Sequence, residues 1–152
     1  MPPSKKNNFG YLIHDVARLL RRRFDAEAQR NDFTMPQWRA IAQLAHEDGI
    51  TQTALAGLME SDPMTVGGII ERLDAKGMVI RETDPNDSRA KIVKITEKAR
   101  ALVGAMRLMA ESIYADAFQD ISDADRETTL RVLTRVSENL SAQNAAPKGD
   151  QL

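Results

Sequence analysis

Residues 62–95 constrain the fold of this chain more than any other stretch. Asp62 and Pro63 form a helix start, because aspartate is a favoured N-cap and proline is tolerated in the first helical turn. Gly77 is expected to end this helix. Two segments rich in β-branched residues follow, on either side of the turn-forming residues 84–90. A helix followed by a hairpin with a long tip predicts the recognition helix and wing of a winged helix-turn-helix.

The remaining helices are predicted from capping residues and from apolar side chains at three- and four-residue spacing. Thr34 and Gln37 fit a capping box. Thr51, Thr96 and Ser122 are suitable N-caps for later segments. The helices are expected at 9–30, 34–47, 51–59, 96–119 and 122–140.

This order of elements predicts a mainly α protein with a small β-hairpin, which belongs to the α+β class. A winged helix-turn-helix lobe should span 34–95, between long N-terminal and C-terminal helical regions at 9–30 and 97–140. The ends of the chain, 1–8 and 141–152, have little to bury and are predicted to be disordered tails.

The helix that begins at Pro63 has one apolar side. The spacing i, i+3, i+4, i+7 predicts a buried face made by Val66, Ile69, Ile70 and Leu73. The opposite face carries Met64, Thr65, Gly68, Glu71, Arg72 and Ala75. Its N-terminal half has few bulky groups, so it fits a major groove about 12 Å wide. Amides at the helix N-terminus are expected to bind phosphate.

Two features of this stretch have alternative interpretations. Gly67 and Gly68 each cost the helix about 0.8 to 1 kcal/mol relative to alanine. They indicate close packing against a neighbouring helix, neutral drift, or close approach of the backbone to DNA. Arg89 either faces solvent or reaches into a minor groove, where narrow A·T-rich segments attract arginine. Asp87 could hold Arg89 through a carboxylate pair.

Composition excludes several classes of function. The chain has 152 residues, a net charge of −1, a pI of about 6.1 and no cysteine, which rules out disulfides, zinc fingers and thiol catalysis. His14 and His46 lie on different predicted helices and have no nucleophile or metal-ligand spacing around them. We therefore expect no catalytic residues, no metal and no cofactor. No apolar run is long enough for a membrane span, so we expect a cytoplasmic protein.

Two segments carry a resemblance to a known family. These are ERLDAKGMVIRE at 71–82 and DPNDSRAKIVKITEKA at 84–99. With the order of elements from Phe9 to Leu140, they make the chain resemble the MarR family of transcriptional regulators, and its SlyA-like branch most closely. The resemblance implies a homodimer in which 9–30 and 97–140 form the dimerisation region. It also implies that each protomer places a recognition helix in the major groove and a wing in the minor groove of a palindromic operator.

The resemblance also assigns site residues. It implies DNA contacts at Gln52, Pro63, Thr65, Gly68, Arg72, Asp87, Ser88, Arg89 and Lys91. The chain departs from the family where Gly67-Gly68 replaces a frequent Thr-Arg and where Ser88 replaces a frequent arginine. The loss of those arginines shifts the expected specificity toward DNA shape.

Many relatives bind aromatic carboxylates or phenols, and the resemblance places His14, Arg18 and Trp38 in such a ligand cleft. The alternatives are a Trp38 that is ordinary core and an Arg18 that pairs with an acid across the dimer. The predicted function is a dimeric double-stranded DNA-binding repressor that a small aromatic ligand releases. The alternative is a winged-helix protein interaction module, because residues 62–95 hold six basic and six acidic side chains.

Overall fold

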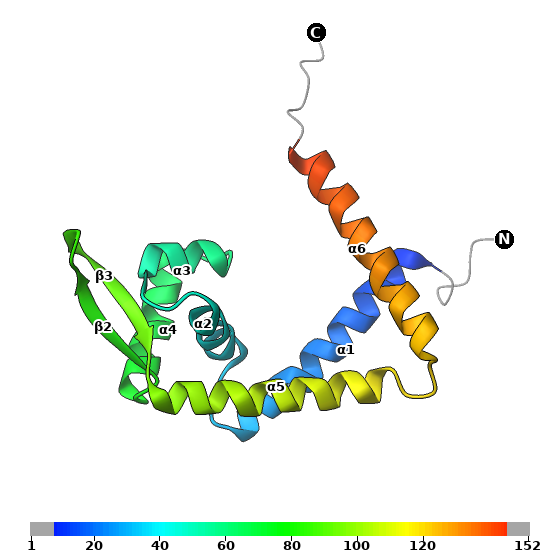
Figure 1. Cartoon of the computed structure of the whole chain (residues 1–152), viewed down its shortest axis with the longest axis horizontal. Coiled ribbons are helices and arrows are strands. Elements are labelled where there is room, and N and C mark those ends of the chain that lie inside the picture. Colours follow the sequence, from blue (N-terminus) through cyan, green and yellow to red (C-terminus); the bar gives the residue numbers. More distant parts are fainter. Residues whose placement is uncertain (1–7, 146–152) are drawn as a thin grey trace, which may run out of the picture. The chain divides into compact units, whose positions relative to one another are not determined.

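The protein is described by a computed structural model over residues 8–145 (Figure 1). It is mainly helical, with a small antiparallel sheet of three strands. The chain divides into two compact units, Met1–Ile113 and Tyr114–Leu152. The elements are α1 (Phe9–Arg30), α2 (Met35–His46), β1 (Ile50–Thr51), α3 (Gln52–Leu58), α4 (Pro63–Ala75), β2 (Val79–Asp84), β3 (Asp87–Ile95), α5 (Glu97–Ala117) and α6 (Asp123–Ala145).

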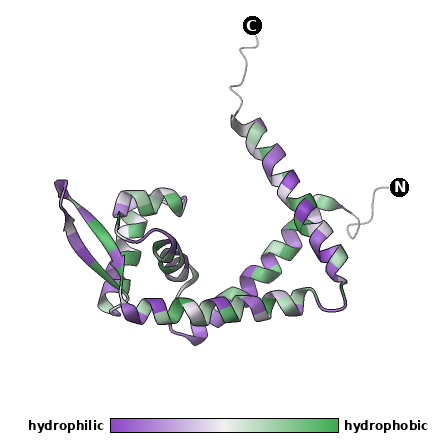
Figure 2. Cartoon of the chain, viewed as in Figure 1, coloured by the Kyte–Doolittle hydropathy of each residue, from purple (hydrophilic) through white to green (hydrophobic). Residues whose placement is uncertain are grey.

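Helix α1 begins where the sequence predicts, because the Asn8 side chain caps it and accepts a hydrogen bond from the Tyr11 amide at 3.1 Å. Its apolar stripe is largely uncovered within this chain, as Figure 2 shows by the hydrophobic residues along the helix. Phe9 is 57% exposed and Val16 is 53% exposed. Ala28 is the buried residue of the helix. The stripe therefore has no role in the core of a single protomer.

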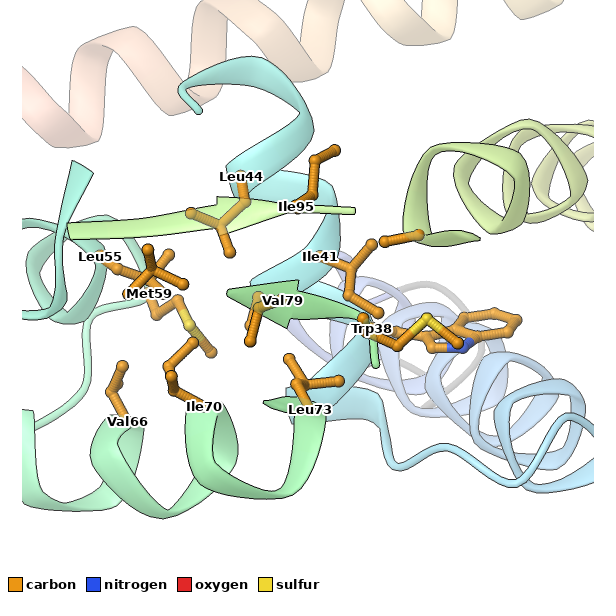
Figure 3. Packing of buried hydrophobic residues seen from close by; sticks show 14 of the residues in the cluster. Trp38, Ile41, Leu44, Leu55, Met59, Val66, Ile70, Leu73, Val79 and Ile95 are labelled. Carbon is orange, nitrogen blue, oxygen red and sulfur yellow. The ribbon is translucent and has the colours of Figure 1, made fainter. Parts of the chain in front are cut away.

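Helices α2, α3 and α4 and the sheet enclose the core of the first unit (Figure 3). The predicted capping box starts α2, since the Gln37 amide donates to Thr34 Oγ1 at 3.3 Å and Gln37 Oε1 accepts from the Thr34 amide at 3.1 Å. The largest fully buried side chains come from α2, α3, α4 and two strands: Ile41, Leu44, Leu55, Val66, Ile70, Leu73, Val79 and Val93. This core fixes α4 on the lobe by one side only.

The sheet differs from the predicted two-stranded hairpin. Strand β1 adds to the hairpin, and the strand order is β1-β3-β2 with antiparallel pairing throughout. The prediction of a long tip is wrong in form, because β2 and β3 run up to a two-residue turn at Pro85 and Asn86. Asp84 makes this turn tight, since its Oδ1 accepts from the Asn86 amide at 2.8 Å.

The tip is irregular for a different reason. Lys91 pairs with Thr83 and Asp87 pairs with Asp84, so the register leaves residues 88–90 without partners on β2. This arrangement is a bulge on β3, and bulges bend a strand and redirect its side chains. Ser88 and Arg89, two of the four wing residues predicted to contact DNA, therefore lie on the bulged segment, whereas Asp87 and Lys91 are paired with β2.

The two long C-terminal helices begin at the predicted caps. Thr96 Oγ1 accepts from the Ala99 amide at 3.2 Å, and Ser122 Oγ accepts from the Asp125 amide at 3.1 Å. Helix α6 continues past Leu140 to Ala145, so the predicted disorder from residue 141 is wrong for 141–145, whose alanines and glutamine favour helix. The predicted tails at 1–7 and 146–152 lie outside the described residues. No helix within 8–145 is both long and apolar enough to cross a membrane.

Candidate nucleic-acid interface

Helix α4 has the two faces that its sequence predicts. Val66, Ile70 and Leu73 are completely buried against the core, and Ile69 packs partly buried beside them. The opposite face is open to solvent: Met64, Thr65, Gly68, Glu71, Arg72 and Ala75 are all exposed. Met64 has the most accessible large apolar side chain of the described residues, at 88% exposure. A helix held on one side and open on the other can be placed in a DNA groove without disturbing the core.

The N-terminus of α4 is closed by its own cap. Asp62 Oδ1 accepts from the Thr65 amide at 2.9 Å, and Asp62 Oδ2 accepts from the Thr65 hydroxyl at 2.5 Å. These hydrogen bonds hold the pKa of Asp62 below its ordinary value, and the bond from the Thr65 hydroxyl has the largest effect. The amides of Thr65 and Val66 are thus both bonded to Asp62, and Pro63 has no amide hydrogen to offer to a phosphate.

The two adjacent glycines have different surroundings. A Cβ on Gly67 would lie 2.9 Å from Gln52 Nε2, whereas a Cβ on Gly68 would meet no atom within 4 Å. Gly67 therefore allows the close packing of α4 against the side chain of Gln52. Gly68 has no such packing role within residues 8–145, so of the predicted alternatives neutral drift and close approach to DNA remain.

Gln52 and Pro63, both predicted at the DNA interface, are joined to each other. Gln52 is the first residue of α3, is half-buried, and donates from Nε2 to the Pro63 carbonyl at 3.2 Å. This bond fixes the start of α4 against the start of α3. Gln52 therefore has a structural role in the helix-turn-helix, and its Oε1 and the second N–H of its Nε2 remain for other hydrogen bonds.

The arginines of residues 34–95 fall into two groups. Arg81 is held by Asp74 at 2.9 Å, and Arg39 donates to the Met59 carbonyl at 3.2 Å. The side chains of Arg72 and Arg89 form no hydrogen bond or ion pair with any residue of 8–145. An unpaired guanidinium is available for phosphate or base contacts, so the structure distinguishes the two predicted DNA-contacting arginines from the others.

The wing carries the other predicted residues, and one predicted contact is absent. Asp87 Oδ1 accepts from the backbone amide of Arg89 at 2.9 Å instead of pairing with its guanidinium. The short loop geometry favours the local amide, which leaves the Arg89 side chain unattached. Ser88 is exposed, and Lys91 Nζ donates to Thr83 Oγ1 at 2.8 Å. Among the described wing residues, the Arg89 guanidinium has no partner, and the Lys91 ammonium donates to a neutral hydroxyl.

A cavity of about 480 Å³ lies between α2 and α5, next to Phe24 of α1. Its walls are mostly apolar, and basic groups lie among them at Arg39, His46 and Arg107. No aspartate or glutamate lines it. The volume is in the range of small-molecule sites. An apolar cavity with cationic groups is suited to an aromatic or aliphatic anion.

The residues predicted to line a ligand cleft are not all in this cavity. Trp38 lines it and is 3% exposed, and its Nε1 has no hydrogen-bond partner. His14 is exposed and Arg18 pairs with Asp15 at 2.5 Å, and neither lines the cavity. The structure thus brings Trp38 to the cavity and leaves the other two predicted residues outside it.

Sequence reasoning missed the basic groups of the cavity. Arg39 and His46 are seven residues apart on α2, which places them on one side of that helix, and Ala42 lies between them. This spacing was a signal in the sequence, although Arg107 on α5 could be added only from the tertiary structure. Within 8–145 no group of histidine, aspartate and glutamate side chains is arranged to hold a metal ion.

Comparison with known proteins finds similarity to one family. Residues 33–91 match the family model of the MarR family. The transcriptional regulator HosA of Escherichia coli O111:H- is 26% identical over 105 residues, which cover 69% of this chain and 78% of HosA.

Solved structures share the fold. A "probable transcriptional regulator" from Pseudomonas aeruginosa is 28% identical, with a TM-score of 0.72 over 88% of this chain and 99% of that chain. The reduced form of MarR from E. coli is 23% identical, with a TM-score of 0.78 over 85% of this chain and 96% of that chain. Residues 33–91 are therefore similar to the MarR family of transcriptional regulators, and the solved structures share the winged helix fold of this chain.

Proposed function

We propose that this protein is a homodimeric, cytoplasmic repressor of the SlyA-like branch that binds a palindromic operator. The observation that carries the proposal is the pairing state of the arginines. Arg72 on the exposed face of α4 and Arg89 on the wing are unpaired, whereas Arg81 of the same lobe is neutralised by Asp74. Arg72 is positioned to enter a major groove with α4, and Arg89 to enter the adjacent minor groove.

Dimerisation is supported by apolar surface that the single chain leaves uncovered. Along α1 the exposed large side chains are Phe9, Tyr11, Leu12, Ile13, Val16 and Leu19, and in α6 they are Leu130, Val132, Leu133 and Leu140 (Figure 2). A contiguous apolar side on a long helix marks a protein interface when the monomer has nothing to cover it. A two-fold dimer through these helices would present two copies of α4, about one helical turn of DNA apart.

The proposed effector is a small aromatic molecule that carries an acidic group. One solved structure of the same fold supports a ligand in this class. CouR from Rhodococcus jostii RHA1 is 20% identical, with a TM-score of 0.72 over 88% of this chain and 94% of CouR, and was crystallised with p-coumaroyl-CoA. In this chain the cavity beside Trp38 offers apolar walls for a ring, and Arg39 and Arg107 offer cations for the acid.

The joint between α5 and the DNA-binding lobe supports release by such a ligand. Lys98 Nζ donates to the Lys76 carbonyl at 3.0 Å, and Thr96 Oγ1 donates to the Gly77 carbonyl at 2.7 Å. These bonds tie the first turn of α5 to the end of α4. A ligand that widens the space between α2 and α5 would therefore move α4, and the spacing of two copies of α4 determines whether both reach their half-sites.

Selection of bound sequences from random duplex DNA tests the DNA-binding proposal. We expect enrichment of a palindrome with half-sites about one helical turn apart, and an affinity that falls steeply with salt. The alternative function, a protein interaction module, predicts no enrichment and no salt-dependent shift. Asymmetric sites alone would contradict the two-fold dimer.

Intrinsic fluorescence tests the effector. Trp38 is the only tryptophan of the chain and lines the cavity, so a bound ring should quench its emission. Salicylate is the probe and salicylamide is its neutral control. We expect salicylate to quench more strongly, Arg107→Gln to reduce the difference, and Arg107→Lys to preserve it. Equal quenching by both probes would show that charge does not contribute to binding in the cavity.

A further inference from the structure

The N-terminal part of the exposed face of α4 has an unusual hydrogen-bonding character. We call Asp62, Met64, Thr65 and Gly68 the leading edge of the helix. The Thr65 hydroxyl already donates to Asp62 Oδ2 at 2.5 Å, so its free lone pairs can only accept. Asp62 is ionised at neutral pH because its pKa lies below its ordinary value. Met64 and Gly68 have no side-chain donor, so the leading edge consists of acceptors and apolar atoms.

The acceptors of the leading edge restrict which base atoms it can contact in a major groove. Guanine N7 and O6, adenine N7 and thymine O4 are all acceptors, and the only donors there are adenine N6 and cytosine N4 amino groups. An acceptor placed against another acceptor loses its water and gains no partner, which is unfavourable. The charged carboxylate of Asp62 makes this restriction stronger, since it is also repelled by backbone phosphates.

We propose that the leading edge of α4 reads the operator by accepting a hydrogen bond from an exocyclic amino group, adenine N6 or cytosine N4. This inference rests on the proposed function, because it requires α4 to enter the major groove. It excludes guanine as the base read by Asp62 and Thr65. Arg72, which is unpaired and lies two turns after Thr65, keeps the donor role and is the residue suited to guanine.

Met64 is the second observation that fits this chemistry. Its side chain is 88% exposed at the leading edge, where it packs against nothing in the core cluster. The thymine methyl group is the apolar group that the major groove presents, and thymine is the partner of adenine. A leading edge with acceptors beside an apolar side chain therefore matches an A·T pair better than a C·G pair.

The test uses the full chain and the palindrome returned by selection from random duplexes. Base analogues are placed one at a time under the leading edge, at the positions of each half-site that Met64→Ala perturbs most. Purine replaces adenine and 2-pyrimidinone replaces cytosine, which removes the amino group from each. Uracil replaces thymine, which removes the methyl group. 7-Deazaguanine replaces guanine, which removes N7.

We expect loss of one amino group to weaken binding about tenfold, equivalent to about 1.4 kcal/mol, and 7-deazaguanine at the same positions to change affinity little. The purine and 2-pyrimidinone substitutions show whether adenine or cytosine provides the amino group that the leading edge contacts. Uracil should weaken binding where purine does, since the methyl group and the adenine amino group belong to one base pair.

A protein variant links the effect to Asp62. Asp62→Asn keeps an N-cap, because asparagine caps as well as aspartate, and it adds a donor. In this variant loss of the amino group should weaken binding by less than about threefold. Glu71→Gln is the matched control, since it removes one negative charge from the same exposed face and should retain the tenfold effect.

The outcomes separate this inference from the proposed function. Absence of any enriched duplex overturns the proposed function. A second outcome is a palindrome that the protein binds without needing the amino groups under the leading edge but with a requirement for guanine N7 there. That outcome overturns this inference and leaves the proposed function standing. Equal amino-group effects in wild type and Asp62→Asn also overturn it.

Discussion

Replacement of Gly68 by alanine should stabilise the fold and weaken DNA binding at the same time. Gly68 lies inside α4, and a Cβ at this position would meet no atom within 4 Å. Alanine is favoured over glycine in a helix interior by about 0.8 to 1 kcal/mol, and no clash offsets this gain. For a chain of this length the melting temperature should rise by about 2 to 4 °C.

The neighbouring glycine provides a contrast. A Cβ on Gly67 would lie 2.9 Å from Gln52 Nε2, so Gln52 must move away and lose its 3.2 Å bond to the Pro63 carbonyl. That bond contributes about 0.5 to 1.5 kcal/mol, which is close to the gain in helix propensity. Gly67→Ala should therefore leave the stability nearly unchanged, although the substitution is chemically the same.

DNA binding should respond in the opposite direction at Gly68. If the missing side chain lets α4 approach the base edges, a methyl group inserts one carbon into a close contact. Overpacking by one such group costs about 1 to 3 kcal/mol, so affinity should fall by about fivefold or more. No stability loss can account for this effect, because the same variant is more stable.

The assay measures thermal unfolding and operator affinity on the same preparations. Gly104→Ala is the matched control, since Gly104 is exposed inside α5 and a Cβ there also meets no atom within 4 Å. It should gain similar stability and bind the operator as wild type does. If Gly68→Ala binds the operator with the affinity of the wild type, the close approach to DNA is refuted. Gly68 would then have no structural explanation.

Further predictions concern the wing, the α4 cap and the α2 cap. Arg89→Ala should flatten the salt dependence of binding by about one unit of slope, whereas Arg81→Ala, which removes a paired arginine, should leave the slope unchanged. Thr65→Val should raise the carboxyl pKa of Asp62 toward its ordinary value in an NMR titration, because the hydroxyl bond is the main cause of the depression. The stabilisation from that depressed pKa is present at neutral pH and lost as pH falls through the folded-state pKa, so the variant should lose less stability in acid. Thr34→Ala should lower the free energy of unfolding by about 0.5 to 2 kcal/mol in denaturant titrations.

The features that the sequence predicts correctly depend on local spacing. The caps at Thr34, Asp62 and Thr96 and the two faces of α4 follow from residues within one or two helical turns of each other. The buried face of α4 could be predicted because the i, i+3, i+4, i+7 pattern is set by helix geometry alone. The same locality explains why Thr65 and Arg72 lie on the exposed face of α4, as predicted.

The features that the sequence does not predict depend on distant residues. Strand β1 forms only because Ile50 lies opposite Val93, and a segment of two residues carries no strand pattern of its own. Arg107 reaches the cavity only when α5 packs beside α2. The partner of Arg81 is Asp74, which lies on another element, so its pairing could not be predicted from charge counts.

This difference between paired and unpaired charges predicts the salt dependence of binding. Residues 62–95 hold as many basic as acidic side chains, but Arg81 and Lys94 are committed to Asp74 and Glu82, so the free arginines are Arg72 and Arg89. In the proposed dimer these give four phosphate or groove contacts, and a slope of log affinity against log salt of about −3.6.

Such a slope is shallow, so electrostatic attraction gives weak non-specific binding and base contacts must supply most of the affinity for the operator. A titration from low to physiological salt measures the slope directly. A slope steeper than about −7 would show that the paired cations leave their partners for phosphate, and the distinction drawn between the two groups of arginines would then be wrong.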